Sequence, residues 1–298
     1  MAEATYILSA ESTVDLPYEY VTHRNIPVAF YTYAINGTVY EDNMDRDPDA
    51  EKFFYEQIDA GNIPSTSQIS YGAYYEYLES LLKQGDVIHL CFGTGMTRSY
   101  YNAAQAAEEL RENYPDRKLY VIDTLCSCGG YGLITDDAAD RRDEGMSIDD
   151  LNEWVLSRRL NYHHEFFNSD LSYFKRTGRM SGPAATIASV LDIVPSMHLN
   201  SAGRIIAYGK VRGLKKELKH IIDEMLAHAE NGKDYSGKCF INHARNEETA
   251  LLLKQMLSDN FPNLKDIRIY KIGSIITAHC GPGTISMYYY GDERISDE

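Results

Sequence analysis

The first half of the chain alternates short runs of β-forming residues with longer segments of helical periodicity. This alternation is typical of parallel α/β units, in which helices connect neighbouring parallel strands. The pattern predicts strands at residues 6–9, 87–91 and 119–122, and helices at 49–60, 71–84, 148–160 and from the loop after residue 95 to 113. We therefore expect an α/β fold whose N-terminal part holds a mostly parallel sheet in three layers.

The second half mixes the same two kinds of element. Ser201-Ala202-Gly203 is a short turn between two strand-like runs, which predicts an antiparallel pair in a mixed sheet. Asn36-Gly37, in the first half, is a strong hairpin signal between residues 28–33 and 38–40. The pattern predicts further helices at 183–191, 214–229 and 247–258, and strands at 193–199, 205–211, 239–243, 267–272 and 285–290.

A chain of 298 residues is long enough for about two domains. We expect an N-terminal α/β domain at residues 1–160 and a C-terminal mixed-sheet α/β domain at residues 161–298. The cleft between two such domains is the default place for a ligand.

Composition excludes several classes of protein. The formal net charge of −15 argues against binding to nucleic acid phosphates and against broad adsorption to anionic membranes. A local basic patch is nevertheless present at Lys210, Arg212, Lys215, Lys216 and Lys219. No secretory signal or membrane span is visible, and the five cysteines are scattered, so we expect a cytoplasmic protein without stable membrane insertion. Cys126 and Cys128 lack the further ligands of a zinc site, and no metal is expected.

The segment from Ile272 to Thr284 sets one histidine among apolar residues, directly before a rigid glycine-proline-glycine turn. Proline restricts the backbone and the glycines permit conformations closed to other residues, so the turn holds His279 in place. One interpretation is a tight connection into the last strand. The other is an imidazole that faces an apolar ligand with one polar end.

Two loops in the first half offer hydroxyl groups. Pro64-Ser65-Thr66-Ser67-Gln68 lies before a predicted helix, where it either caps the helix or donates hydrogen bonds to an anionic head group. Gly93-Thr94-Gly95 follows a predicted strand and resembles the start of a dinucleotide fingerprint, but Arg98 stands where the third glycine belongs. Thr97 and Ser99, in the same loop, are suited to hold a carboxylate or phosphate.

The signatures of common hydrolases are absent. There is no Gly-x-Ser-x-Gly elbow, no phosphate-binding loop that ends in Gly-Lys-Ser/Thr, and His164-Glu165 lacks the second histidine of a zinc protease. A basic turn at residues 173–182 precedes a segment rich in small residues, where Ala188 leaves room for a slender ligand. Arg179 in this turn is either a structural or surface residue, or part of a ligand-binding network.

Taken together, these motifs resemble the DegV family, the bacterial fatty-acid-binding subunits of fatty acid kinase. The matching segments, in chain order, are Ser12 with Asp15-Leu16-Pro17, Thr66-Ser67-Gln68, Gly93 to Tyr100, Asp123, Gly178-Arg179, Ile193 with Pro195, and Ile272 to Gly283. The chain departs from the family pattern at Glu11, Ile69, Arg98 and Val194, where the family usually has aspartate, proline, glycine and lysine.

The resemblance implies that one long-chain fatty acid lies in a tunnel between the two domains. Thr66, Thr97 and His279 would then hold its carboxylate, with Arg179 ordering the network. We expect additional head-group contacts from Ser65, Ser67, Gln68 and Ser99, and a tunnel wall that includes Ile275, Ile276 and Ala188. The resemblance also implies a chain that is not itself an enzyme and uses no cofactor. A separate kinase protein would phosphorylate the bound carboxylate for phospholipid synthesis.

Two other classes stay open at this point. One is a nucleotide- or dinucleotide-dependent enzyme that uses the Gly93-Thr94-Gly95 loop. The other is an interaction protein that binds neither lipid nor nucleotide.

Overall fold

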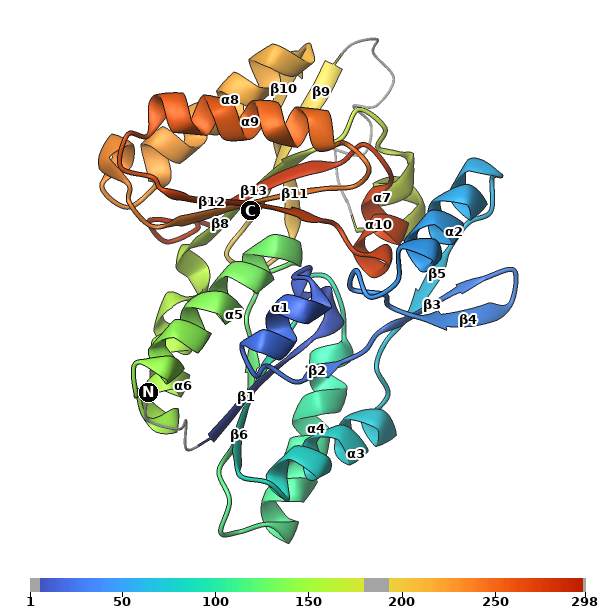
Figure 1. Ribbon diagram of the computed structural model, residues 1–298, viewed down its shortest axis with the longest axis vertical. Coiled ribbons are helices and arrows are strands. Elements are labelled where there is room, and N and C mark those ends of the chain that lie inside the picture. The colour runs from blue at the N-terminus through green and yellow to red at the C-terminus, as the bar shows by residue number, and fades with distance from the viewer. Residues whose placement is uncertain (1–5, 180–192, 297–298) are drawn as a thin grey trace.

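The computed structural model describes residues 6–179 and 193–296, and they form three β-sheets with helices around them (Figure 1). A four-stranded sheet has the order β2-β1-β6-β7, with β1 at Tyr6–Glu11, β2 at Val28–Ala29, β6 at Asp86–Cys91 and β7 at Leu119–Asp123. All its neighbouring strands are parallel, as the alternating pattern predicts.

Helices cover both faces of this parallel sheet. They are α3 (Tyr71–Leu82) and α4 (Ser99–Asn113) on one side, and α5 (Cys128–Asp143) and α6 (Ile148–Arg158) on the other (Figure 1). The three-layer arrangement buries β6 almost completely, which explains its run of apolar residues.

A six-stranded mixed sheet forms the other half of the molecule, in the order β10-β9-β8-β13-β11-β12. Its strands are β8 (Tyr162–Phe167), β9 (Ile193–Leu199), β10 (Ile205–Arg212), β11 (Lys238–His243), β12 (Asp266–Lys271) and β13 (Ile285–Tyr290). Only β11 and β12 pair in parallel, and the predicted antiparallel pair around Ser201-Ala202-Gly203 is confirmed as β9 and β10. Helices α8 (Leu214–His228) and α9 (Glu247–Asn260) pack against this sheet.

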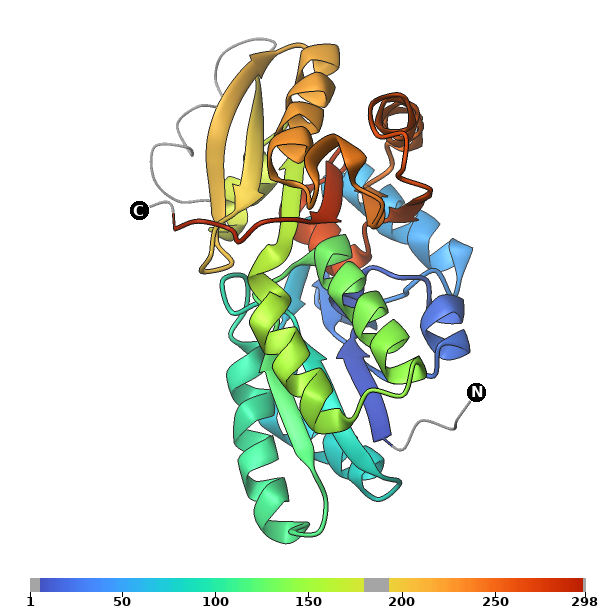
Figure 2. The same cartoon turned by 90° about the vertical axis from the view of Figure 1, so that its left-hand side faces the viewer.

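Helix α5 lies between the two large sheets and contacts strands of both (Figures 1 and 2). Its glycines permit this close approach: a Cβ atom at Gly129 would lie 2.0 Å from Asn242 Oδ1, and one at Gly130 would lie 2.3 Å from His164 Nε2. One hydrophobic core therefore continues from the four-stranded sheet into the six-stranded sheet. The division of the chain at residue 160 stays a prediction.

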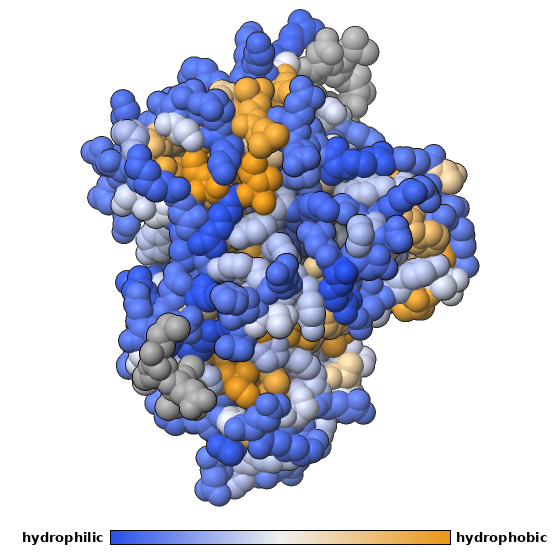
Figure 3. Space-filling view, viewed as in Figure 1, coloured by the Kyte–Doolittle hydropathy of each residue, from blue (hydrophilic) through white to orange (hydrophobic). Residues whose placement is uncertain are grey.

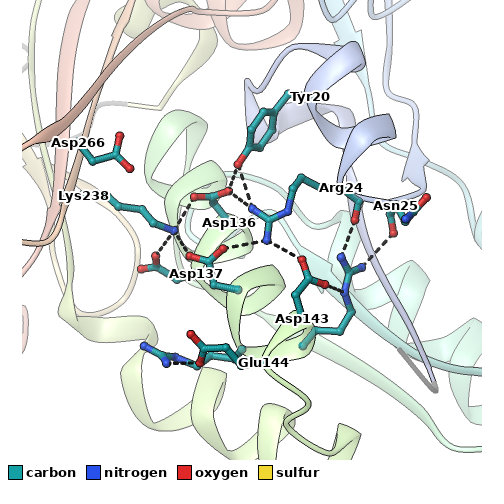
Figure 4. Close-up of polar contacts among 12 residues, drawn as sticks. Tyr20, Arg24, Asn25, Asp136, Asp137, Asp143, Glu144, Lys238 and Asp266 are labelled. Atoms are coloured by element: carbon teal, nitrogen blue, oxygen red, sulfur yellow. Dashed lines mark hydrogen bonds and ion pairs between the residues drawn. The ribbon is translucent and has the colours of Figure 1, made fainter. Parts of the chain in front are cut away.

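Ion pairs add a second link between the sheets (Figure 4). The fully buried carboxylate of Asp136 on α5 contacts Arg24, 3.0 Å away, Lys238 on β11, 2.6 Å away, and Arg268 on β12, 3.2 Å away. Arg24 follows helix α1 (Tyr18–His23), so the cluster joins α1, α5 and the six-stranded sheet.

A small antiparallel sheet, in the order β4-β3-β5, projects from the side of the molecule (Figure 1). It consists of β3 (Thr32–Ile35), β4 (Thr38–Glu41) and β5 (Ser65–Ser67), and helix α2 (Pro48–Asp59) packs beside it. The predicted hairpin is confirmed, since Asn36 and Gly37 have φ angles of 51° and 82°.

Some elements differ from the prediction. The hydroxyl-rich segment at β5 is a strand, because its backbone pairs with β3. The segment around His279 contains a helix, α10 (Ser274–Cys280), before the glycine-proline-glycine turn. Strand β8 and helix α7 (Ser172–Thr177) were not predicted, because both are short and lack a clear period. The predicted helix at 183–191 lies outside the described residues.

The remaining short elements are 3-10 helices at Ser12–Val14, Arg159–Asn161 and Gly232–Asp234. Most of the face in Figure 3 is hydrophilic, and one apolar area lies over α9, where Leu251 and Leu252 are exposed. Among the helices within residues 6–179 and 193–296, none is long and apolar enough to span a bilayer.

Candidate functional site

A cavity of about 180 Å³ lies between the two large sheets. Segments from both halves of the chain line it: β5, the loop after β6, the start of α5, strands β8 to β10, β13 and α10. Its apolar lining consists mainly of Tyr31, Phe92, Met96, Phe166, Phe174, Leu199, Ile205, Ile272, Ile275, Ile276 and Tyr288. A cavity with this lining suits a hydrocarbon group.

Polar side chains meet at one part of the wall. Thr66 Oγ1 lies 2.7 Å from His279 Nε2, within hydrogen-bond distance, although the two residues are 213 positions apart in the sequence. Strand β5 holds Thr66 in place by pairing it opposite Tyr33 on β3. Helix α10 positions His279 near its C-terminal end. The two motifs that the sequence singled out therefore form one polar pair.

The environment of His279 favours the neutral imidazole. Burial, together with the positive charges of Arg179 and Arg176, lowers the pKa of His279 to about 4. Its Nδ1 atom is buried and has no hydrogen-bond partner among the described residues. An anion at this position would be attracted by both arginines and would raise the pKa of the imidazole again.

Other predicted head-group residues lie at the same cavity. Thr97 lines it, and its Oγ1 accepts a hydrogen bond from the backbone N–H of Ser99 at the start of α4, 3.2 Å away. Ser67 and Gln68 also line the cavity. So does Arg179, whose Nη1 donates to the Thr177 carbonyl at 2.6 Å.

Two predicted contacts are not brought to the cavity. Ser65 is exposed and does not line the cavity. Ser99 is fully buried, and its hydroxyl accepts from the backbone N–H of Ile69 and lies 3.2 Å from the Tyr74 hydroxyl, so it supports the fold. Of the predicted wall residues, Ile275 and Ile276 line the cavity, and Ala188 lies outside the described residues.

The Gly93-Thr94-Gly95 loop is held by protein contacts. Asp123 accepts hydrogen bonds from the backbone N–H of Thr94, 3.1 Å away, and from its hydroxyl, 2.6 Å away. A Cβ atom at Gly95 would lie 2.1 Å from the carbonyl oxygen of Gly203, in the turn between β9 and β10. Figure 2 shows that hairpin reaching toward the four-stranded sheet. Close packing of backbones thus accounts for Gly95 without a nucleotide.

Sequence reasoning did not identify several lining residues. Phe166 and His164 come from β8, Leu199 and Ile205 from the β9–β10 hairpin, and Phe174 from α7. His164 was considered only as part of an incomplete zinc-protease motif. The other four carry no chemical signature beyond apolar character, which equally describes ordinary core residues.

Fold and site together define an α/β protein with a mostly apolar cavity that ends in a cationic, hydroxyl-bearing wall. The family model described as "Uncharacterised protein, DegV family" matches residues 8–292. The chain belongs to the DegV family, and the family resemblance of its motifs is thereby confirmed.

Relatives of the chain match it over nearly their whole length. A DegV domain-containing protein of Clostridium perfringens is 34% identical, over 97% of this chain and 98% of the relative. A protein of Thermotoga maritima named fatty acid-binding protein is 28% identical, over 92% of this chain and 94% of its own. The crystal structure of a fatty acid binding DegV family protein from Streptococcus agalactiae has a TM-score of 0.81 at 26% identity and covers 98% of this chain and 100% of that one. This likeness confirms the predicted α/β fold.

Proposed function

We propose that this chain binds one long-chain fatty acid in the cavity and presents its carboxylate to a separate kinase. The observation that carries the proposal is the Thr66–His279 pair, at 2.7 Å, in the wall of an otherwise apolar cavity. Fatty acid binding by the relative from Thermotoga maritima and the neighbour from Streptococcus agalactiae supports the same ligand class.

The carboxylate lies at the polar part of the wall in this proposal. A carboxylate accepts several hydrogen bonds, and the hydroxyls of Thr66 and Thr97 and the imidazole of His279 can supply them. Bonds in which one partner is charged are the stronger kind, so the guanidinium of Arg179 favours the ionised ligand. These contacts fix the direction in which the fatty acid lies.

The acyl chain supplies most of the affinity. Each buried CH₂ group contributes about 0.8 kcal/mol, so roughly fifteen methylenes give on the order of 12 kcal/mol before the costs of association. Phe166, Leu199 and Ile275 are among the side chains that would contact the chain. The polar contacts therefore matter more for orientation than for total affinity.

The kinase step rests on the family resemblance. A kinase protein would transfer phosphate to the carboxylate while the tail stays buried, and this chain would perform no ATP chemistry. The exposed basic patch on β10 and the first turns of α8, from Lys210 to Lys219, is a candidate docking surface for the kinase.

Native mass spectrometry of gently purified protein tests the ligand. We expect one fatty acid per chain, released by denaturing extraction, and rebinding of oleate or palmitate to the delipidated protein. If the purified protein releases no fatty acid and the delipidated protein binds neither oleate nor palmitate, the proposal is wrong. A thermal shift with a nucleotide or dinucleotide instead would favour the enzyme alternative, and no shift with any of these ligands would favour the interaction protein.

A further inference from the structure

A second cavity, of about 30 Å³, lies where the opening motif of the chain meets the segment that leads into α10. This volume is enough for a water molecule or a small ion. Its charged lining consists of four carboxylates and one ammonium group, namely Asp15, Asp42, Asp45, Glu51 and Lys271. The wall therefore carries an excess of negative charge.

Lys271 is engaged by two of the four acids. Its Nζ lies 2.6 Å from Glu51 Oε2 and 3.4 Å from Asp45 Oδ1. Asp15 and Asp42 have no such cation within ion-pair distance among the described residues, although they are only 6% and 1% exposed. The part of the cavity wall that these two acids form is thus anionic and has no ion pair among the described residues, while Arg46 attracts Asp42 from beyond ion-pair distance.

Three of the four oxygens of this aspartate pair lack a hydrogen-bond partner among the described residues: Asp15 Oδ2 and both oxygens of Asp42. The fourth, Asp15 Oδ1, accepts a hydrogen bond from the backbone N–H of Gly273 at 3.0 Å. Buried carboxylate oxygens almost always contact hydrogen-bond donors or metal ions. Three carboxylate oxygens without a hydrogen-bond partner beside one cavity therefore indicate a ligand.

The two carboxylates converge on one point. A Cβ atom at Gly273 would lie 2.7 Å from Asp15 Oδ1 and 3.5 and 3.7 Å from the two oxygens of Asp42. Glycine at this position leaves the space between the acids open. The same glycine is the N-cap of α10, so the aspartates lie at the base of the helix that carries His279.

The aspartate cluster on α5 shows what a compensated group of acids looks like in this protein. Asp136, Asp137 and Asp140 lie close together, but the ammonium of Lys238 contacts all three, and Arg24 contacts Asp136 as well (Figure 4). Arg268 is a further cation on Asp136, 3.2 Å away. Within residues 6–179 and 193–296, no lysine or arginine lies within ion-pair distance of Asp15 or Asp42, and three of their four carboxylate oxygens have no hydrogen-bond partner.

We propose that Asp15 and Asp42 bind one hard divalent cation of the Ca²⁺, Mg²⁺ or Mn²⁺ class in the small cavity. Oxygen ligands are those that such cations prefer, and the three orphan oxygens supply them. Ser12, which also lines the cavity, and water would complete the coordination. The cation would link the opening motif to the start of α10, and its site does not depend on the proposed lipid function.

Thermal unfolding of the full chain tests the site. The protein is stripped with a chelator and titrated with CaCl₂, MgCl₂ or MnCl₂ at constant ionic strength. At about a hundred times its Kd, the preferred cation should raise Tm by roughly 5 °C, and competition among the three salts identifies it. Mn²⁺ binding followed by electron paramagnetic resonance should give one site per chain.

Asp42→Asn and Asp15→Asn should each remove the shift, whereas Asp116→Asn, at an exposed aspartate, should keep it. The readout is the difference between cation and no cation, so a changed baseline Tm of a variant does not affect it. No shift of the wild-type Tm with any of the three salts would overturn the proposal. The proposal would also be wrong if Asp15→Asn and Asp42→Asn both showed the same cation-induced Tm shift as the wild type.

Discussion

The two cavities touch the same residue, Ile272, and differ in the charge of their walls. The larger has an apolar lining with His279 and Arg179 at its polar part, and the smaller has Asp15 and Asp42. In our proposals the first environment binds an anion that carries a hydrocarbon tail, and the second binds a small cation. One short segment, the entry to α10, lines both cavities although their walls carry opposite charges.

The largest effect should come from a charge in the apolar wall. Ile275→Asp would bury a carboxylate beside the acyl chain without a partner, which costs several kcal/mol, so fatty acid affinity should fall by about a hundredfold or more. Binding of oleate to delipidated protein measures the loss. The cation-induced Tm shift should persist in this variant if the two cavities are separate sites, and retained wild-type lipid affinity would contradict the assignment of Ile275 to the tunnel wall.

A smaller effect is expected at the polar part of the cavity. Thr66→Val keeps the shape of the side chain but removes the hydroxyl that contacts His279, and it should weaken fatty acid binding by about tenfold, the value of one good hydrogen bond. Acyl-phosphate formation in the presence of a fatty acid kinase should fall further, because the carboxylate is no longer oriented.

Ser65→Ala is the matched control, since this hydroxyl lies on the same strand but is exposed and outside the cavity. It should leave both binding and phosphorylation unchanged. Equal losses of both in Thr66→Val would contradict the division of roles between tail and head group.

The smallest effect is a change with pH. The pKa of His279 is about 4 in the folded protein without ligand and about 6.5 when unfolded, so its neutral form stabilises the fold above pH 6.5. That contribution is lost as pH falls from 6.5 toward 4. A bound carboxylate raises the folded pKa, so fatty acid binding takes up a proton and should strengthen several-fold from pH 7.5 to 5.5.

Binding titrations across this pH range measure how fatty acid affinity changes with pH. In His279→Gln the affinity should change much less with pH. An unchanged slope in that variant would show that another group takes up the proton. The same experiment with the cation site would show no dependence on His279, since that residue does not line the small cavity.

Much of the architecture could be predicted because local patterns carry it. The alternation of β-forming and helical segments predicted the parallel sheet, and Asn36-Gly37 predicted the β3–β4 hairpin of the small antiparallel sheet through the φ angles that those residues accept. Strand β5 could not be predicted in this way, because its three hydroxyl residues are held by pairing with β3 and not by their own propensity.

The sequence likewise predicts some residues of the candidate site and not others. Thr66, Thr97, Arg179 and His279 could be singled out because each belongs to a motif with chemical character, and all four line the cavity. Phe166 and Leu199 could not, since an apolar side chain in a strand has the same signature whether it faces a core or a cavity. Ser65 and Ser99 were predicted as head-group contacts because they lie close to Thr66 and Thr97 in the sequence. In the structure Ser65 is exposed, Ser99 is buried, and neither lines the cavity.

The sequence by itself determined most of the elements, the family and the chemical types at the polar part of the large cavity, because propensity, turn chemistry and motifs act over short distances. Only the tertiary structure decided which of these groups meet. The Thr66–His279 contact and the Asp15–Asp42 pair each join segments far apart in the chain, and the packing of the sheets around α5 and the entry to α10 brings them together. Burial then sets the charge preference of each cavity, because desolvation acts on a side chain only after the fold has enclosed it.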